Sequence, residues 1–153
     1  MTVAVAWSGG KDSALMLQQL LDDPDVDVDR LVTTVNGDVD RVTIHGVRAD
    51  LVEAQAAAIG LPLDAVPLPG GLDGEEYGDR MAALNDRLAA EGVDEVAFAD
   101  LHLEDIREYR EETLADAALE GRWPLWGEAP DALARRFVDD DRFAATVCCV
   151  DPG

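Results

Sequence analysis

Lysine is almost absent from this chain, and basic residues of any kind are few. Lys11 is the sole lysine among 12 basic residues, which face 33 acidic residues and leave a formal net charge of −21. An extended nucleic-acid partner needs a basic face, so we do not expect one, although a local site for one polyanionic small molecule stays open. An acidic coat with so little lysine is typical of a halophile, because about 1 M salt screens charges over roughly 3 Å. A merely acidic mesophilic protein is the alternative.

Cysteine and long apolar runs are also scarce. Cys148 and Cys149 are adjacent, and neighbours in a strand point to opposite faces, so we expect no structural disulfide and a reducing, cytoplasmic location. No apolar run approaches the ~18 residues that span a bilayer. The N-terminus lacks the basic segment of a signal peptide, so we expect no membrane partner. The 48% hydrophobic content predicts a single domain over residues 1–153 with its own core.

Strand-like and helix-like segments alternate along the chain. Short apolar runs predict strands at residues 3–7, 31–36, 63–68, 94–100 and 143–150. Helical periodicity, often ended by glycine, predicts helices at 13–21, 48–59, 75–91, 104–120 and 131–138. The alternation predicts an α/β fold with a five-stranded parallel sheet between helices. Ligands of such sheets lie beyond the carboxyl ends of the strands, which makes the loop after the first strand the first candidate. The loops near residues 36–47, 69–74 and 121–130 are further candidates for the rim of a ligand site.

That loop, Ser8-Gly9-Gly10-Lys11-Asp12-Ser13, carries the clearest chemical signal. Its glycines permit a tight turn and a close approach of backbone to ligand. Loop amides and a helix N-terminus attract an anion, Ser8 and Ser13 add hydroxyl donors, and Lys11 adds a full charge. The loop therefore predicts a phosphate or pyrophosphate site, and it matches neither the Walker A nor the dinucleotide-binding glycine pattern. A plain capping loop with Asp12 as the cap is the alternative, but it leaves the sole lysine unexplained.

The hexapeptide resembles the pyrophosphate loop (PP-loop) of the adenine-nucleotide alpha hydrolase superfamily, whose members cleave ATP between the α and β phosphates. Three further segments resemble the diphthine–ammonia ligase group: DRVTIHGVR at 40–48, DLHLEDIREYRE at 100–111 and PLWG at 124–127. This resemblance implies a three-layer α/β/α sandwich with strand order 3-2-1-4-5. It also implies that relatives usually carry a further C-terminal segment with a Gly/Glu-rich motif, which is not in the printed sequence. Nucleotide binding is therefore a safer expectation than ligase activity.

The resemblance further implies an ATP-dependent ligase that forms AMP and pyrophosphate, with ATP and Mg²⁺ as cofactors. A carboxylate of diphthine on elongation factor 2 would attack the α-phosphorus, and ammonia from ammonium would then displace AMP from the acyl-adenylate. Two alternatives stay open, namely a PP-loop ligase or amidase acting on a small metabolite and a non-catalytic adenine-nucleotide sensor. The sequence also leaves homo-oligomerisation open.

The candidate metal ligands and two of the candidate catalytic residues, Lys11 and Asp12, follow from the same interpretation. Lys11 and the loop amides suit the leaving pyrophosphate. Mg²⁺ needs only one or two protein carboxylates, and Asp12 and Asp100 are the candidates because each lies at or just beyond the carboxyl end of a predicted strand. The alternatives are a helix cap for Asp12 and a solvated rim acid for Asp100.

Three further sets of residues complete the predicted site. Arg107 and Arg110 share one helix face and are candidate catalytic residues that would hold phosphate or the substrate carboxylate; local ion pairs are the alternative. His45 is a candidate nucleotide contact or base, with an uninvolved loop histidine as the alternative. The resemblance implies that adenine pairs with backbone at the end of the second strand, where Thr34 lies.

Overall fold

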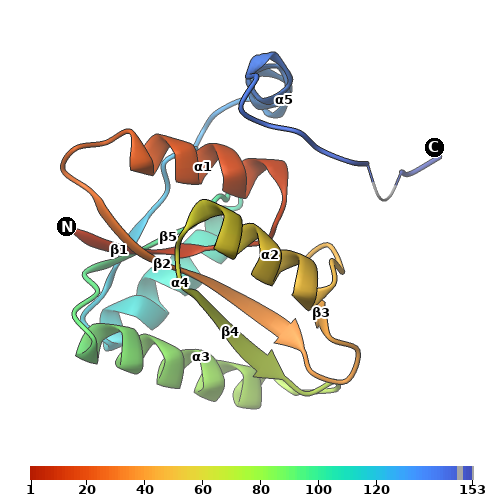
Figure 1. The fold of residues 1–153 in the computed structure, drawn as a ribbon. Coiled ribbons are helices and arrows are strands. Elements are labelled where there is room, and N and C mark those ends of the chain that lie inside the picture. Colours follow the sequence, from red (N-terminus) through yellow and green to blue (C-terminus); the bar gives the residue numbers. More distant parts are fainter. Residues whose placement is uncertain (148–149, 153) are drawn as a thin grey trace.

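Helices and strands alternate in the computed structural model, which describes residues 1–147 and 150–152 (Figure 1). The strands in these residues are β1 (Thr2–Ala6), β2 (Asp27–Asn36), β3 (Arg41–Val42), β4 (Leu63–Leu68), β5 (Glu95–Ala97) and β6 (Glu120–Arg122). The helices are α1 (Lys11–Leu21), α2 (Ala49–Ile59), α3 (Gly74–Ala90), α4 (Glu104–Asp116) and α5 (Pro130–Asp139). None of the described helices is both long enough and apolar enough to cross a membrane.

The central sheet is mostly parallel. Among the described strands, β4, β2, β1, β5 and β6 lie side by side in that order, and all of them run parallel. Counted along the chain this is the order 3-2-1-4-5 that the resemblance implied. The short β3 is antiparallel to the end of β2, with Val35 opposite Val42. The strand order reverses between β1 and β5, so the loop after β1 lies at the crevice where such sheets bind their ligands.

Helices cover both faces of the sheet, as Figure 1 shows for α1 and α2 on one face and α3 on the other. Alternate residues of β1 divide between the two faces. Val3 and Val5 belong to a core cluster with α1, α2 and α5, whereas Ala4 belongs to a second cluster with α3 and α4. The three-layer α/β/α arrangement therefore agrees with the sequence prediction.

The fifth parallel strand is β6, and the prediction of a strand at residues 143–150 is wrong for the residues described there. Residues 143–147 and 150 are not in a strand, and Val147 and Val150 are 78% and 73% exposed. The predicted helix 104–120 ends at Asp116 instead, which frees the chain to form β6 beside β5. The expectation for Cys148 and Cys149 lies outside the described residues.

An ion pair fastens β6 to the sheet. The guanidinium of Arg122 donates to both carboxylate oxygens of Glu95 on the neighbouring β5, with 3.2 Å between Nη2 and Oε1. Glu95 is only 6% exposed, so the pair compensates a charge that would otherwise be costly to bury. The hydrogen bond from Arg122 to Glu95 raises the pKa of the arginine. A three-residue strand centred on Gly121 has no apolar pattern, which is why the sequence did not predict it.

Candidate functional site

The loop after β1 makes a sharp turn into α1. Gly9 has a φ of +78°, which is in the left-handed region that favours glycine. A Cβ on Gly9 would lie 3.0 Å from Oε1 of Gln55. Gly10 is the N-cap residue of α1, and no side chain caps this helix. The capping role considered for Asp12 is therefore wrong, because Asp12 is already the second residue of the helix.

Two serines hold the loop together from inside. The amide of Ser8 donates to Oγ of Ser13 at 3.2 Å, and the two hydroxyl oxygens are 2.7 Å apart. The amide of Gly10 in turn donates to Oγ of Ser8 at 3.3 Å. Ser13 is only 2% exposed. In this structure both hydroxyls thus form hydrogen bonds within the loop and stabilise its conformation.

Other amides of the loop are left for a ligand. Within the described chain, the N–H groups of Gly9, Lys11, Asp12 and Ser13 have no hydrogen-bond acceptor, whereas Ala14 already donates to the carbonyl of Gly10. Unpaired amides at a helix N-terminus, reinforced by the helix dipole, favour an anion. A loop with this geometry could hold a phosphate group, and we refer to residues 8–13 as the phosphate cradle.

Lys11 and Asp12 form an ion pair at the mouth of this cradle. Nζ of Lys11 lies 2.8 Å from Oδ1 of Asp12, and the two side chains are 39% and 33% exposed. Such a half-exposed pair is weak and can be exchanged for stronger partners. An incoming phosphate could take the ammonium, which would leave the carboxylate free to bind a cation.

Gln55 on α2 forms hydrogen bonds to two residues at the cradle, and the sequence analysis did not predict this role. Its Oε1 accepts from the indole Nε1 of Trp7 at 3.0 Å, and its Nε2 donates to the carbonyl of Gly9 at 3.4 Å. Trp7 is 5% exposed. The only signal in the sequence is a glutamine in an otherwise alanine-rich helix, which does not reveal a partner 46 residues away.

His45 reaches the cradle from the segment between β3 and α2. Its Nε2 would lie 3.2 Å from a Cβ on Gly10, so the ring lies against the glycine backbone. His45 and Gly46 have φ values of +67° and +61°, which turn the chain back after β3. The structure thus brings His45 together with the loop, while a contact of His45 with nucleotide stays a prediction.

Thr34 lies at the end of β2, and its polar groups already have partners. Its carbonyl accepts from the amide of Thr43 at 3.0 Å and from the Thr43 hydroxyl at 3.2 Å. Its own hydroxyl donates to Oγ1 of Thr43 at 3.0 Å. An adenine bound at Thr34 would have to share or displace these contacts, so its placement there stays a prediction.

The structure places Arg110 and Asp100 together beyond the end of β5. Nε of Arg110 lies 3.0 Å from Oδ2 of Asp100, and Nε1 of Trp123 donates to the same oxygen at 3.4 Å. The guanidinium of Arg110 also lies 4.2 Å from the ring centre of Phe98. Arg110 is thus in an ion pair, but with Asp100, a candidate metal ligand, and not with Glu104, Asp105 or Glu111, the partners considered from the sequence.

Arg107 has different partners one turn earlier. Its Nε donates to Oε1 of Glu111 at 2.9 Å. Its guanidinium lies over two indoles, 4.5 Å from the ring centre of Trp123 and 4.8 Å from that of Trp126. These cation–π contacts anchor the segment after β6 to α4. The sequence analysis did not foresee that the two arginines and two tryptophans form one cluster.

The donor set for a metal ion is small. No group of three or more His, Cys, Asp or Glu side chains in residues 1–147 and 150–152 is arranged so that it could hold a metal ion by itself. Mg²⁺ bound to nucleotide needs only one or two carboxylates, because phosphate oxygens and waters supply the other ligands. Asp12 fits this requirement from its position beside the cradle. Asp100 fits it less well, since Arg110 and Trp123 share the same carboxylate oxygen.

Comparisons with known proteins place the chain in a family. Residues 1–118, which include β1 to α4, match the family described as diphthamide synthase N-terminal domain. No curated protein matches the chain. A crystal structure from Methanocaldococcus jannaschii, described as a predicted subunit of tRNA methyltransferase, has a TM-score of 0.51 and 19% identity. The match covers 89% of this chain and 73% of that one, and at this identity it shows the fold alone. The family match covers most of the sequence, and the chain therefore belongs to the diphthamide synthase N-terminal domain family.

Proposed function

We propose that this protein is an ATP-dependent ligase that amidates diphthine on elongation factor 2, releasing AMP and pyrophosphate. The observation that carries the proposal is the cradle after β1, with unpaired amides at the start of α1 and the sole lysine at its mouth. Membership of the diphthamide synthase N-terminal domain family supports an enzyme of the PP-loop type that uses ATP.

The proposed reaction has two steps. The acceptor carboxylate attacks the α-phosphorus of ATP, the bond to the bridging oxygen breaks, and pyrophosphate leaves. Ammonia then attacks the carbonyl carbon of the acyl-adenylate, AMP departs, and the nitrogen loses a proton to give the amide. The protein contributes binding, orientation and charge at the leaving phosphates.

The residues of the cradle have distinct proposed roles. Lys11 and the loop amides bind the phosphates that leave as pyrophosphate. Asp12, once its lysine partner has moved to phosphate, is the carboxylate proposed to hold Mg²⁺, which when bound would neutralise charge on the phosphate oxygens. His45 lies against Gly10 and is proposed to contact the bound nucleotide from there.

Arg107 and Arg110 stay candidates for the acceptor carboxylate. A guanidinium has five N–H donors, so the present contacts of each arginine leave donors for a ligand. Asp100 stays a candidate second metal ligand, for which Arg110 would have to move away. We further propose that the protein works in a cytoplasm of high salt, for which its charge of −21 is the support.

Pyrophosphate release from ATP and Mg²⁺ in high salt, with ammonium, tests the proposal. Release that requires elongation factor 2 carrying diphthine is the expected result. Lys11→Ala should abolish release and weaken ATP binding, while Arg135→Ala, a change at an arginine with a side chain 79% exposed on α5, should do neither. ATP binding without release under any condition would instead support a sensor. Release that does not depend on the factor would support a small-metabolite ligase.

A further inference from the structure

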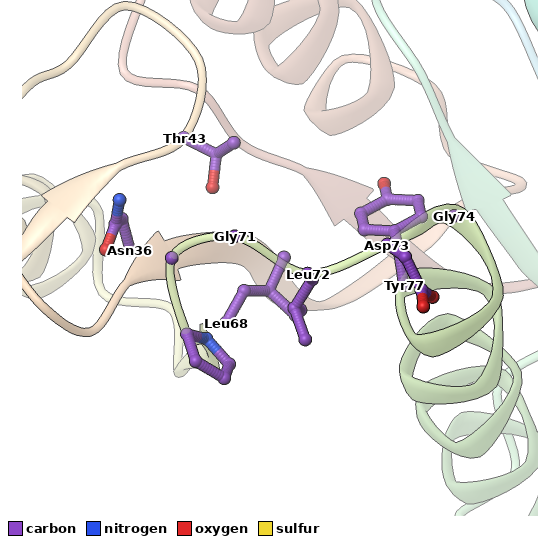
Figure 2. Close-up of a pocket in the computed structure, with 10 residues that line it drawn as sticks. Asn36, Thr43, Leu68, Gly71, Leu72, Asp73, Gly74 and Tyr77 are labelled. Atoms are coloured by element: carbon purple, nitrogen blue, oxygen red, sulfur yellow. The ribbon is translucent and has the colours of Figure 1, made fainter.

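A cleft of about 400 Å³ opens at the carboxyl ends of β2 and β4. The phosphate cradle follows the carboxyl end of β1, so the two lie at the same end of the parallel strands. The cleft lies between the ends of β2 and β4 and the start of α3. Figure 2 shows Leu68 at the end of β4, Leu72 in the loop that follows and Tyr77 near the start of α3, with Asn36 and Thr43 across from them. The proposed chemistry of the cradle does not use this cleft.

The lining is apolar and aromatic, and it carries no basic side chain among the described residues. Leu68 and Leu72 supply apolar surface, and Tyr77, a residue that is 37% exposed, supplies an aromatic ring. Asp73 is the one charged group in the lining, and its Oδ1 accepts from the amide of Glu76 at 2.8 Å. An anion would find no counter-charge here, whereas a cation would find an aromatic face and a carboxylate.

The surroundings strengthen the negative potential of the cleft. Glu75 and Glu76 lie in the first turn of α3, two and three residues after Asp73. Asp38 does not line the cleft, but its Oδ2 accepts at 2.9 Å from the amide of Gly70, which does. Carboxylates near an apolar hollow attract a cation and repel an anion.

The loop that forms the floor of the cleft is held in place before any ligand binds. A Cβ on Gly70 would lie 2.5 Å from Oδ2 of Asp38, so this hydrogen bond depends on glycine. Gly71 has a φ of +75°, which turns the loop towards the capped start of α3. A preformed hollow avoids the cost of ordering a loop on binding.

One short segment touches both the cleft and the cradle. Thr43 lines the cleft, and His45, two residues later, lies against Gly10 of the cradle. The segment is tied to β2 through the Thr43 amide and the Thr34 carbonyl. A molecule held in the cleft would therefore lie beside the segment that also contacts the phosphate cradle.

We propose that this cleft is a binding subsite for an organic cation, with an alkylated ammonium group over the ring of Tyr77. Alkylated ammonium suits the lining because it combines a positive charge with an apolar surface, which an aromatic ring and leucines accept without hydrogen bonds. That the cation belongs to the acceptor rests on the proposed function. That the cleft takes a cation rests on its own lining.

Binding of choline to the full chain tests the cation preference without ATP. Chemical-shift changes in NMR spectra should map to the loop 69–74 and to Tyr77, and 3,3-dimethylbutan-1-ol, the neutral analogue of choline, should bind much more weakly. Tyr77→Leu should weaken choline about three- to fivefold, while Tyr77→Phe keeps the ring and should bind as the wild type does. Tyr109→Leu changes the other tyrosine, which lies on α4, and is the matched control. Equal binding of choline and its neutral analogue, or shifts located elsewhere, would overturn the proposal.

A second measurement separates this subsite from the proposed ligase reaction. Choline should bind to Lys11→Ala as it does to the wild type, because Lys11 belongs to the cradle. If choline binds in the cleft but does not compete with the acceptor in pyrophosphate release, the cation subsite stands and its link to the acceptor is wrong. If the protein releases no pyrophosphate at all, choline binding still decides the proposal for the cleft.

Discussion

The imidazole of His45 lies directly against the backbone of Gly10, at the point where the phosphate cradle becomes α1. A Cβ on Gly10 would be 3.2 Å from Nε2 and 3.4 Å from Cδ2 of this ring. The contact joins two segments that are 35 residues apart in the sequence. It also means that the width of the cradle depends on the absence of a side chain at Gly10.

Gly10→Ala should therefore weaken nucleotide binding more than it weakens the fold. The new methyl group pushes the His45 ring outwards by a few tenths of an ångström and narrows the cradle, and we expect ATP affinity to fall several-fold in a calorimetric titration. The double variant Gly10→Ala with His45→Ala should recover part of this loss. Gly78→Ala in α3, where nothing lies within 4 Å of the new Cβ, is the control and should raise stability by about 0.5–1 kcal/mol. Unchanged ATP affinity in Gly10→Ala would show that the ring and the nucleotide do not share the cradle.

Gln55→Glu should separate the two hydrogen bonds of this side chain. A carboxylate still accepts from Nε1 of Trp7, but it cannot donate to the carbonyl of Gly9 and repels it. We expect the free energy of unfolding to fall by about 1–2 kcal/mol and ATP affinity to fall with it, because the cradle loses its support. Gln19→Glu, the same change at an exposed position on α1, should leave ATP affinity unaffected. A variant that keeps wild-type affinity would show that Gln55 serves only to bury Trp7.

Arg107→Lys should loosen the segment after β6. Lysine keeps the charge but loses the planar group that contacts the rings of Trp123 and Trp126, so we expect a loss of about 1 kcal/mol in the free energy of unfolding. Urea denaturation followed by tryptophan fluorescence measures this change. Arg135→Lys on α5 is the matched control and should change stability by less than about 0.5 kcal/mol. Equal effects of the two substitutions would mean that the contacts of Arg107 with Trp123 and Trp126 do not contribute to stability.

The fold could be predicted largely because its parallel strands other than β6 contain short apolar runs, and the central β1 and β5 are mostly buried. Leu63–Leu68 and the order of the parallel strands followed from short apolar runs and from the resemblance. The exchange of 143–150 for β6 could not be foreseen, because β6 is defined by pairing with β5 and by the Arg122–Glu95 ion pair instead of by its own hydrophobicity. Helix periodicity likewise gave no sign that α4 ends at Asp116.

The cradle could be predicted because its chemistry is contiguous in the sequence, from Ser8 to Ser13. His45 was a candidate only through its place in a rim loop. The hydrogen bonds of Gln55 and the contacts of Arg107 with the two indoles could not be predicted, because each depends on side chains brought together from separate elements. Local motifs thus identify the groups that would touch phosphate, whereas the residues that support them require the three-dimensional structure.

Asp140 should remain ionised at unusually low pH. Hydrogen bonds from the side chain and then the amide of Arg142 lower the pKa of this carboxyl from 3.8 to about 2. A lowered pKa in the folded state means that the pair contributes stability above the ordinary value of 3.8, and that this contribution is lost as the pH falls towards 2. Carbon-13 NMR titration of the carboxyl groups measures the shift directly. In Arg142→Ala the pKa of Asp140 should return to its ordinary value, and an unchanged pKa would contradict the assigned cause.

Increasing KCl should stabilise the fold against urea up to molar salt concentrations. A net charge of −21 on 153 residues makes the folded state repel itself, because folding brings the carboxylates closer together. Screening shortens the reach of this repulsion from about 10 Å at 0.1 M to about 3 Å at 1 M salt. We therefore expect the urea midpoint to rise steadily as KCl increases from about 0.1 M to about 2 M, with most of the gain below about 1 M. Comparison with a variant in which Asp139 and Asp141 become Asn, which keeps the Asp140–Arg142 pair, provides the control, since its salt dependence should be shallower. A midpoint that falls with KCl would mean that attractive ion pairs such as Arg30–Glu91 outweigh the net repulsion.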